Sequence, residues 1–298
     1  MTPAQTGPES AAKTPSPLSW VTIAWVSALL LACYAPVLYR LINQWATDED
    51  MGHGFFVPVI AGYIAWQNRD KISGIAPQPN WWGLVLMAWS ALQLYIGTLG
   101  ADLFLSRTSL VFSIIGAVLL LGGTRYVKIF AFPLFLLFFM VPIPSVIYNQ
   151  ITFPLQIRAS EAAEWAISIL GIPILREGNV LELASQKLNV VEACSGIRSL
   201  LTLTFLSLVY GYFAEKRTWI RVALFFSTIP VAVAANAGRV TLTGVIANFK
   251  PELAEGLFHE ATGWVIFMVA FAILVLVHQV LVRIAIMLEA KHAVPASA

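Results

Sequence analysis

The amino-acid sequence predicts an all-α polytopic membrane protein with about eight transmembrane helices, and with a small extracytoplasmic amphipathic helix and a short β-hairpin or meander before the sixth span. Three observations lead to this fold class. Hydrophobic residues make up 58% of the chain and charged residues only 11%, whereas a soluble domain carries about 25% charged residues. Apolar runs long enough to cross a hydrocarbon core of about 30 Å recur along the sequence. One polar stretch, residues 148–193, interrupts them.

The apolar runs define the eight predicted spans. They occupy residues 18–39, 51–68, 81–99, 103–122, 128–147, 195–213, 222–246 and 261–283. The second is short, and the fourth carries Arg107 near one end. The first is a full-length span without a small-residue cleavage site, so we expect it to be retained rather than removed as a signal peptide. Residues 18–289 then form a single transmembrane domain between a disordered cytoplasmic tail at 1–17 and a cytoplasmic tail at 290–298.

The loop charges predict the orientation of these spans. An even number of spans puts both termini on the same side of the membrane. If that side is cytoplasmic, the inner loops hold the basic residues Arg69, Lys71, Arg125, Lys128, Lys216, Arg217 and Arg221. The outer loops then hold the acidic residues Asp48, Glu49, Asp50, Asp102, Glu252, Glu255 and Glu260. Because cytoplasmic loops carry an excess of Lys and Arg, we expect both termini in the cytoplasm.

The non-spanning segment 148–193 is expected to lie on the outer side. Within it, LQIRASEAAEWAISIL (155–170) is typical of an amphipathic helix, because its charged residues are too polar for lipid. The stretch that follows alternates apolar and polar side chains around Gly178-Asn179 and Ser185-Gln186, which indicates two or three short strands joined by turns. On this topology the segment brings the chain to Cys194 from the outer face.

The motif EACSGIRS (192–199) places a cysteine at the outer start of the sixth span. The free N–H groups of a helix N-terminus favour an anion there, Arg198 lies one turn deeper on the same face, and Glu192 precedes the thiol. This is the kind of setting that lowers a thiol pKa and yields a thiolate nucleophile. A small buried hydrophobe is the alternative. Position alone leaves both open for Cys194, whereas we expect burial for Cys33, inside the first span.

Two further segments bring polar residues to the same leaflet. Arg239 lies 17 residues along the seventh span from Val222, about 25 Å at 1.5 Å per residue, and Asn236 falls on the same helical face. An arginine at membrane depth is costly, so a functional role is favoured over snorkelling to the headgroups. His259 precedes the eighth span. His53, at the outer start of the second span, is a rival base or a site-shaping residue.

These residue types match a thiol acyl-transfer site. The Cys194 thiolate would attack a carbonyl, His259 would carry protons to the leaving amine, and Arg239 would stabilise the oxyanion. The sequence holds no CxxC pair or Cys/His cluster, so we expect neither a metal nor a cofactor. The net charge of +2 is too small to indicate nucleic acid as a partner.

Four segments together resemble the successive motifs of the exosortase/archaeosortase family, polytopic membrane proteins of bacteria and archaea. They are HGFFVPVIAGYIAW (53–66), LREGNVLELASQKLNVVEACSGIRSL (175–200), ANAGRVTLTG (235–244) and HEATGW (259–264). The likeness covers most of the chain from about residue 50 onward, and the EACSGIRS block is quite specific. Position by position, it implies a nucleophile at Cys194, an arginine at Arg239 and a histidine at His259, with Arg198 on the arginine inside the cysteine motif.

The resemblance also implies an activity and partners. It implies a sortase-like cysteine peptidase and transpeptidase of the bacterial inner membrane, with its active site on the periplasmic side. The substrates would be secreted proteins whose C-terminal sorting tail has a Pro-Glu-Pro-type signal, a transmembrane helix and a basic end. Cleavage at the signal would be followed by transfer to an unknown envelope acceptor, and membrane lipid is the other partner expected. Family members often sit beside exopolysaccharide genes.

Two other functions remain open on the sequence. An intramembrane cysteine protease would need the same thiol but would hydrolyse without transfer, and the mass of a covalent acceptor on the product separates the two. A non-enzymatic transporter or scaffold for polysaccharide export would need no nucleophile. Serine chemistry is disfavoured because no GxSxG elbow is present, although Ser195 adjoins the thiol.

Overall fold

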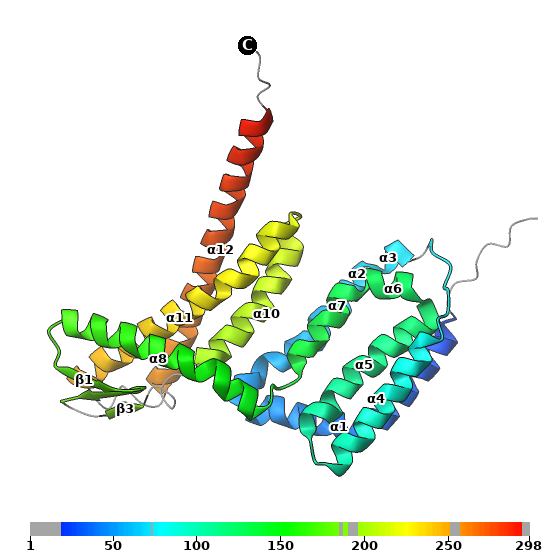
Figure 1. Cartoon of the computed structure of the whole chain (residues 1–298), viewed down its shortest axis with the longest axis horizontal. Coiled ribbons are helices and arrows are strands. Elements are labelled where there is room, and N and C mark those ends of the chain that lie inside the picture. The colour runs from blue at the N-terminus through cyan, green and yellow to red at the C-terminus, as the bar shows by residue number, and fades with distance from the viewer. Residues whose placement is uncertain (1–18, 73, 185–186, 190–195, 251–256, 294–298) are drawn as a thin grey trace, which may run out of the picture. The chain divides into compact units, whose positions relative to one another are not determined.

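A computed structural model of the chain describes residues 19–72, 74–184, 187–189, 196–250 and 257–293, without the side chains at 49, 189, 196–199, 257–260 and 291–293. The described part is almost entirely helical, with one small sheet (Figure 1). Two compact units divide the chain, one of Met1–Thr47 with Gly54–Pro142 and one of Asp48–His53 with Ile143–Ala298. The single domain predicted for 18–289, with its insertion at 148–193, stays a prediction. The predicted tail at 1–17 lies outside the described residues.

The first unit is a bundle of apolar helices. Its elements are α1 (Trp20–Thr47), α2 (Phe56–Gln67), α3 (Arg69–Ile72), α4 (Trp82–Leu99), α5 (Leu103–Gly122), α6 (Thr124–Ile129), α7 (Ala131–Leu136) and the 3₁₀ helix η2 (Leu137–Met140). The backbones of α4 and α5 touch, because a Cβ on Gly83 would collide with the backbone nitrogen of Leu120. Small residues allow such close approach in membrane helices. Asp102 caps α5 by accepting a hydrogen bond from the Leu105 N–H at 2.9 Å.

Hydrogen bonds from two aromatic side chains join α1 to the rest of this unit. The hydroxyls of Tyr34 and Ser113 on α5 lie 2.7 Å apart, and the Trp45 indole N–H donates to the Met140 carbonyl at 3.0 Å. Cys33, also on α1, is exposed. The expectation that Cys33 is buried was therefore wrong. A small apolar side chain on a helix flank needs no protein neighbours where that flank meets lipid.

The multi-pass helical fold predicted from the sequence is confirmed. Among the described residues, five helices are long and apolar enough to cross a membrane, namely α1, α4, α5, α11 (Thr218–Phe249) and α12 (Leu257–Ala293). A sixth span arises if the helices at 131–140 and 145–169 count as one broken span. The exact number of eight stays a prediction.

Two of the predicted spans have shorter helices than expected. The second consists of the 3₁₀ helix η1 (Glu49–Phe55) followed by the 12 residues of α2. The fifth is divided among α6, α7 and η2, and Pro142 and Pro144 separate it from α8 (Ser145–Ile169), because proline cannot donate the backbone hydrogen bond that continues a helix. The sixth, α10 (Gly196–Ala214), has 19 residues and agrees with the predicted span at 195–213 to within one residue.

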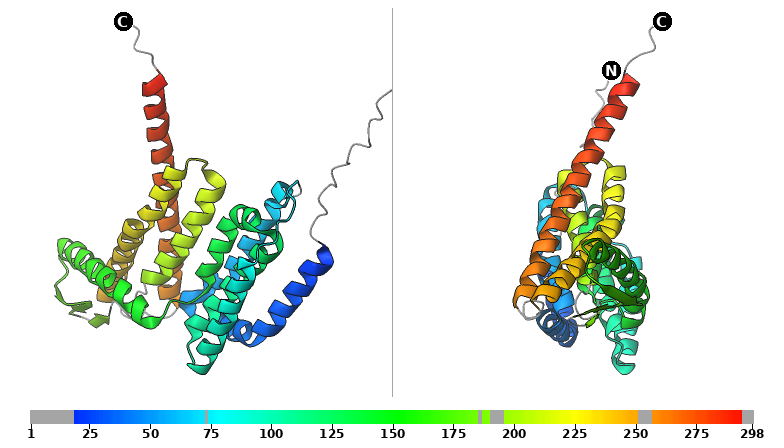
Figure 2. Two further views of the ribbon diagram at one scale, coloured as in Figure 1. Left: turned by 45° about the vertical axis from the view of Figure 1, so that its right-hand side comes forward. Right: turned by 90° about the vertical axis from the view of Figure 1, so that its left-hand side faces the viewer.

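The second unit combines α8, α10, α11 and α12 with a three-stranded antiparallel sheet (Figure 2). The strands β1 (Ile174–Glu177), β2 (Val180–Leu183) and β3 (Lys187–Asn189) are ordered β1-β2-β3, as a meander. Gly178 adopts a φ of 64° in the first turn, a conformation that favours glycine. A helix followed by short strands before the sixth span is thus confirmed, whereas the amphipathic character of the helix stays a prediction. The second predicted turn, at Ser185-Gln186, lies outside the described residues.

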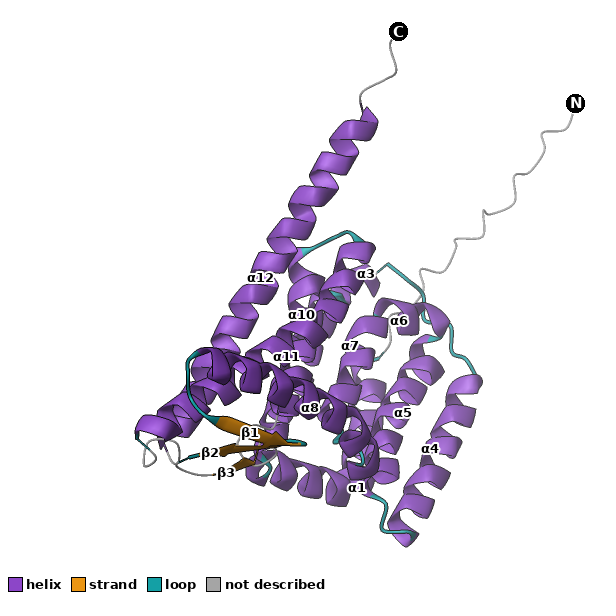
Figure 3. Cartoon of the chain, turned by 60° about the vertical axis from the view of Figure 1, so that its left-hand side comes forward, coloured by secondary structure: helices purple, strands orange, loops and turns teal. Residues whose placement is uncertain are grey.

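The sheet packs against α8 and α11 through a small apolar core (Figure 3). Its members are Ala163, Ile167, Ile172, Leu181, Leu183, Leu188, Val240 and Ala247. At the periphery, the Arg176 Nε donates to a Glu164 carboxylate oxygen at 2.7 Å and ties β1 to α8. This packing fixes the point from which the chain leaves β3 toward the cysteine motif and α10.

Candidate functional site

The first turn of α10 lies level with the polar part of α11. These two helices are consecutive and antiparallel, and the hydroxyls of Thr204 and Thr228 face each other at 3.3 Å in the middle of the pair. Eight residues back along α10 from Thr204 is Gly196, where the helix begins, and eight residues forward along α11 from Thr228 is Asn236. Because both helices rise by about 1.5 Å per residue, Asn236 comes level with the beginning of α10.

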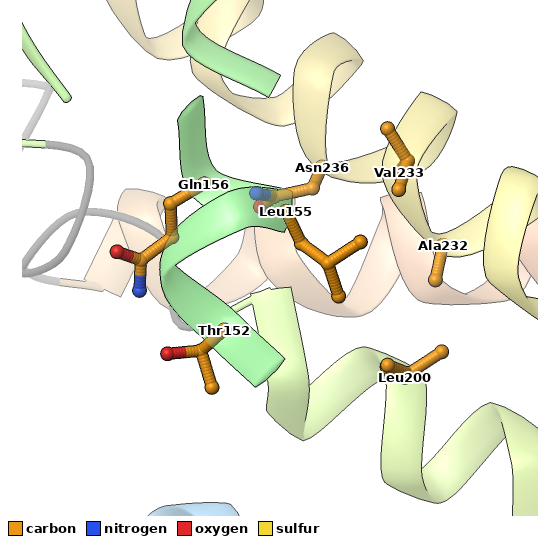
Figure 4. A pocket seen from close by; sticks show the side chains of 7 residues that line it. All are labelled: Thr152, Leu155, Gln156, Leu200, Ala232, Val233 and Asn236. Atoms are coloured by element: carbon orange, nitrogen blue, oxygen red, sulfur yellow. The ribbon is translucent and has the colours of Figure 1, made fainter. Parts of the chain in front are cut away.

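A narrow pocket marks the place where these segments meet. It lies among α8, α10 and α11, and Figure 4 shows the side chains around it. Its lining residues are Thr152, Leu155, Gln156, Leu200, Ala232, Val233 and Asn236. Asn236, predicted as a supporting site residue, is only 7% exposed. The α10 residue in the pocket, Leu200, stands two residues after Arg198.

The sequence prediction missed the polar residues that α8 contributes to this pocket. Thr152 and Gln156 are 3% and 9% exposed, and both project from the same side of α8 (Figure 4). Ser160 continues the row and donates to the Gln156 carbonyl at 2.8 Å. The available signal was the spacing of four residues between these polar side chains, which places them on one helix face. The charged residues of the same helix indicate a surface location and do not show which helix face is buried.

Arg239 lies directly against α12. A Cβ built on Gly263 would come within 3.2 Å of both the Cζ and Nη2 atoms of Arg239. The half-buried Arg239 therefore places its guanidinium over Gly263, a residue of α12 that has no side chain. Residue 259 precedes Gly263 by four positions in the same helix, so it occupies the same face of α12 one turn away. The predicted arginine and the position of the predicted histidine thus share one helix–helix junction.

His53 is buried against a different part of α10. It is 8% exposed, and its ring centroid lies 6.3 Å from that of Phe205. Phe205 follows Arg198 by seven residues, which places it on the same face of α10 and about 10 Å further along the axis. His53 therefore packs on the face that carries residue 198, two turns from it. In the same 3₁₀ helix, Asp50 accepts a hydrogen bond from the Tyr148 hydroxyl at 2.8 Å, which links η1 to α8.

The remaining predicted site residues are described in part or not at all. Cys194 and Glu192 lie outside the described residues, and Arg198 and His259 are described only as backbone within α10 and α12. The described part of the chain brings Arg239, Asn236 and the positions 198 and 259 to adjoining stretches of three helices. The chemical roles of these residues stay predictions.

Comparison with known proteins identifies the family. Residues 45–276 match the family described as transmembrane exosortase. This range contains all four motif segments and every predicted site residue, and it confirms the resemblance drawn from the sequence. No curated protein and no solved structure matches the chain. Since the match covers well over half of its residues, the chain belongs to the transmembrane exosortase family.

Proposed function

We propose that this protein is a cysteine transpeptidase that cleaves the C-terminal sorting signal of secreted proteins and transfers them to an envelope acceptor. Its family comprises membrane enzymes that sort secreted proteins carrying sorting signals. One observation carries the finer proposal. The guanidinium of Arg239 lies against Gly263, one helical turn from residue 259, and α10 begins beside this region two residues after Cys194.

Cleavage would begin with attack of the Cys194 thiolate on the carbonyl carbon of the scissile peptide bond. The carbonyl π electrons move to oxygen, and Arg239 donates hydrogen bonds to the resulting oxyanion. Collapse of the tetrahedral intermediate breaks the C–N bond while protonated His259 gives its proton to the leaving amine. The products are a thioester on Cys194 and the released C-terminal tail.

Transfer would reverse these roles. An acceptor nucleophile attacks the thioester, neutral His259 takes its proton, and the thiolate leaves as the new bond to the acceptor forms. Water in place of the acceptor would give simple hydrolysis. The half-buried setting of Arg239 supports its part in both steps, because a charge–oxyanion interaction is stronger where water is scarce.

We place the site at the outer face of the inner membrane, with both termini in the cytoplasm and with α8 and the sheet on the periplasmic side. The charge distribution of the loops supports this orientation. A substrate tail anchored in the bilayer would then present its Pro-Glu-Pro-type signal next to the start of α10. A reporter enzyme that works only in the cytoplasm should be active when it is fused at residue 218. A reporter that works only outside the cytoplasm should be inactive there.

The decisive experiment replaces the proposed nucleophile. A strain with Cys194→Ala should accumulate secreted proteins with intact C-terminal tails, detected by mass spectrometry of their C-termini. Cys33→Ala is the matched control and should process normally, because Cys33 is an exposed residue of α1. Normal processing in the Cys194→Ala strain would contradict the proposal and favour a transporter or scaffold. A product whose mass includes a covalently attached acceptor indicates transfer, whereas a product with a free C-terminal carboxylate indicates hydrolysis.

A further inference from the structure

The first unit buries an arginine that has no hydrogen-bond or ion-pair partner among the described residues. Arg107, in the second turn of α5, is 4% exposed. Its Nε is fully buried without a hydrogen-bond acceptor, and no hydrogen bond or ion pair joins Arg107 to any described residue. The nearby carboxylate of Asp102 is engaged in capping the Leu105 N–H. Burial of an unpaired guanidinium is strongly unfavourable, so a compensating anion is expected.

A second arginine stands at the same level on the neighbouring helix. In Figure 1, α1 and α5 run in opposite directions, and the Tyr34–Ser113 hydrogen bond sets their register. Six residues onward from Tyr34 is Arg40, and six residues back from Ser113 is Arg107, so the two arginines come level. The two arginines are near enough for their like charges to repel. Two cations therefore stand at the same level of neighbouring helices, where an ion pair would be normal.

The surroundings indicate that the missing anion belongs to a lipid. Arg40 is exposed, and its neighbours Tyr39 and Ile42 are 68% and 46% exposed. These residues belong to the last turns of a helix whose large apolar side chains are exposed along most of its length, as suits contact with acyl chains. Aromatic and basic side chains near the end of a span are typical of the level of the headgroups.

We propose that Arg40 and Arg107 form a binding site for the phosphate of an anionic membrane lipid. The lipid tails would lie along the exposed apolar flank of α1, and the phosphate oxygens would accept hydrogen bonds from both guanidinium groups. Planar guanidinium groups suit such bidentate contacts with phosphate. This site lies within the first unit and is independent of the function proposed above.

Thermal unfolding of the full chain in lipid-free detergent, with single lipids added back, tests the site. Phosphatidylglycerol and a polyisoprenyl phosphate are the phosphate-bearing probes, diacylglycerol is the neutral probe, and inorganic phosphate is the soluble one. The wild-type midpoint should rise saturably by about 5 °C when a bound probe reaches about a hundred times its Kd. The neutral lipid should have no effect. Phosphatidylglycerol carries a phosphodiester, the polyisoprenyl phosphate carries a phosphomonoester, and inorganic phosphate is the free ion. The probe that raises the midpoint at the lowest concentration therefore identifies which of these the site binds.

Three variants assign the effect to the two arginines. Arg107→Met should weaken binding by about tenfold or more, and in lipid-free detergent it should be at least as stable as the wild type, because the unpaired charge is gone. Arg40→Gln, at an exposed position, should weaken binding without affecting folding and keeps the test valid if Arg107→Met fails to fold. Arg125→Met, at an exposed arginine of α6, is the control and should bind normally. Equal lipid stabilisation of the wild type, Arg107→Met and Arg40→Gln would overturn the proposal.

Discussion

The guanidinium of Arg239 on α11 lies over the bare backbone of Gly263 on α12. The two helices also pack against each other away from this point. Further along, Val231 and Ala232 meet Ala270 and Leu274 in a common core. The position of the guanidinium is therefore set by packing between the seventh and eighth predicted spans, and a side chain added at residue 263 acts on it directly.

A methyl group at Gly263 tests this relationship. In Gly263→Ala the new Cβ would lie 3.2 Å from the Arg239 Cζ and Nη2, closer than an ordinary van der Waals contact, so the guanidinium must move. Because displacement by about 1 Å costs about a hundredfold in rate, a shift of a few tenths of an ångström should lower the cleavage rate by about tenfold or less. Single-turnover cleavage of a purified substrate measures this rate in the variant and in the wild type.

The matched control for this variant is Gly62→Ala in α2. A Cβ at Gly62 meets no atom within 4 Å, and alanine is the better helix former, so activity and stability should be unchanged. An unaltered cleavage rate in Gly263→Ala, together with normal folding, would show that the location of this guanidinium does not limit the reaction.

Arg239→Lys separates charge from geometry at the same position. Lysine keeps the positive charge but loses the planar pair of donors. Loss of an oxyanion donor lowers kcat by about 10²–10³-fold, so we expect a smaller but clear fall in kcat for Arg239→Lys, with little change in KM. Arg283→Lys, at an exposed residue of α12, is the control. A rise in KM with normal kcat would instead indicate that Arg239 only binds substrate.

The length of the apolar runs and the pattern of polar residues made the main elements predictable. Apolar runs predicted α1, α4, α5, α11 and α12, and alternation around Gly178 predicted the strands. The period of the α-helix placed Asn236 and Arg239 on one face of α11. The break at 141–144 was signalled by Pro142 and Pro144, but the length of apolar sequence around them outweighed that signal.

The parts of the site that were not predicted depend on contacts between elements. The contact of Gly263 with Arg239 arises from the register of α11 against α12, which no local pattern contains. Thr152 and Gln156 are polar residues of a helix that carries several charges, and only its packing against α10 and α11 shows which of its faces is buried.

Leu181 tests whether the sheet positions the cysteine motif. This central-strand residue is fully buried in the core shared with α8 and α11. Leu181→Ala should lower the free energy of unfolding by about 2–5 kcal/mol and reduce processing, since β3 leads the chain toward α10. The control is Leu175→Ala in β1, where the side chain is 58% exposed. Unfolding curves in detergent measure both, and equal effects of the two substitutions would contradict a role for this core.

Glu215, between α10 and α11, should make stability depend on pH. The Arg217 backbone N–H donates to its carboxylate at 2.8 Å and, despite the opposing effect of burial, holds the pKa of Glu215 below its usual value of 4.5, with further help from the Lys216 N–H and His278. The His278 Nε2 lies 3.4 Å from the other carboxylate oxygen. Because the folded state favours the ionised form, this contribution is fully present above the unfolded pKa and is lost as pH falls through the lower folded value.

Glu215→Gln isolates this contribution. At neutral pH the variant should unfold at a lower temperature than the wild type, because glutamine keeps the size of the side chain but loses the charge that the two backbone N–H groups and His278 stabilise. Below pH 4.5 the two midpoints should converge as the wild-type carboxylate becomes protonated. Glu289→Gln, whose exposed carboxylate pairs with Arg217 at 3.0 Å, should change the midpoint little, since surface ion pairs contribute about 0–1 kcal/mol. A difference between wild type and Glu215→Gln that stays constant from pH 7 to pH 3 would mean that ionisation of this carboxylate does not stabilise the loop between α10 and α11.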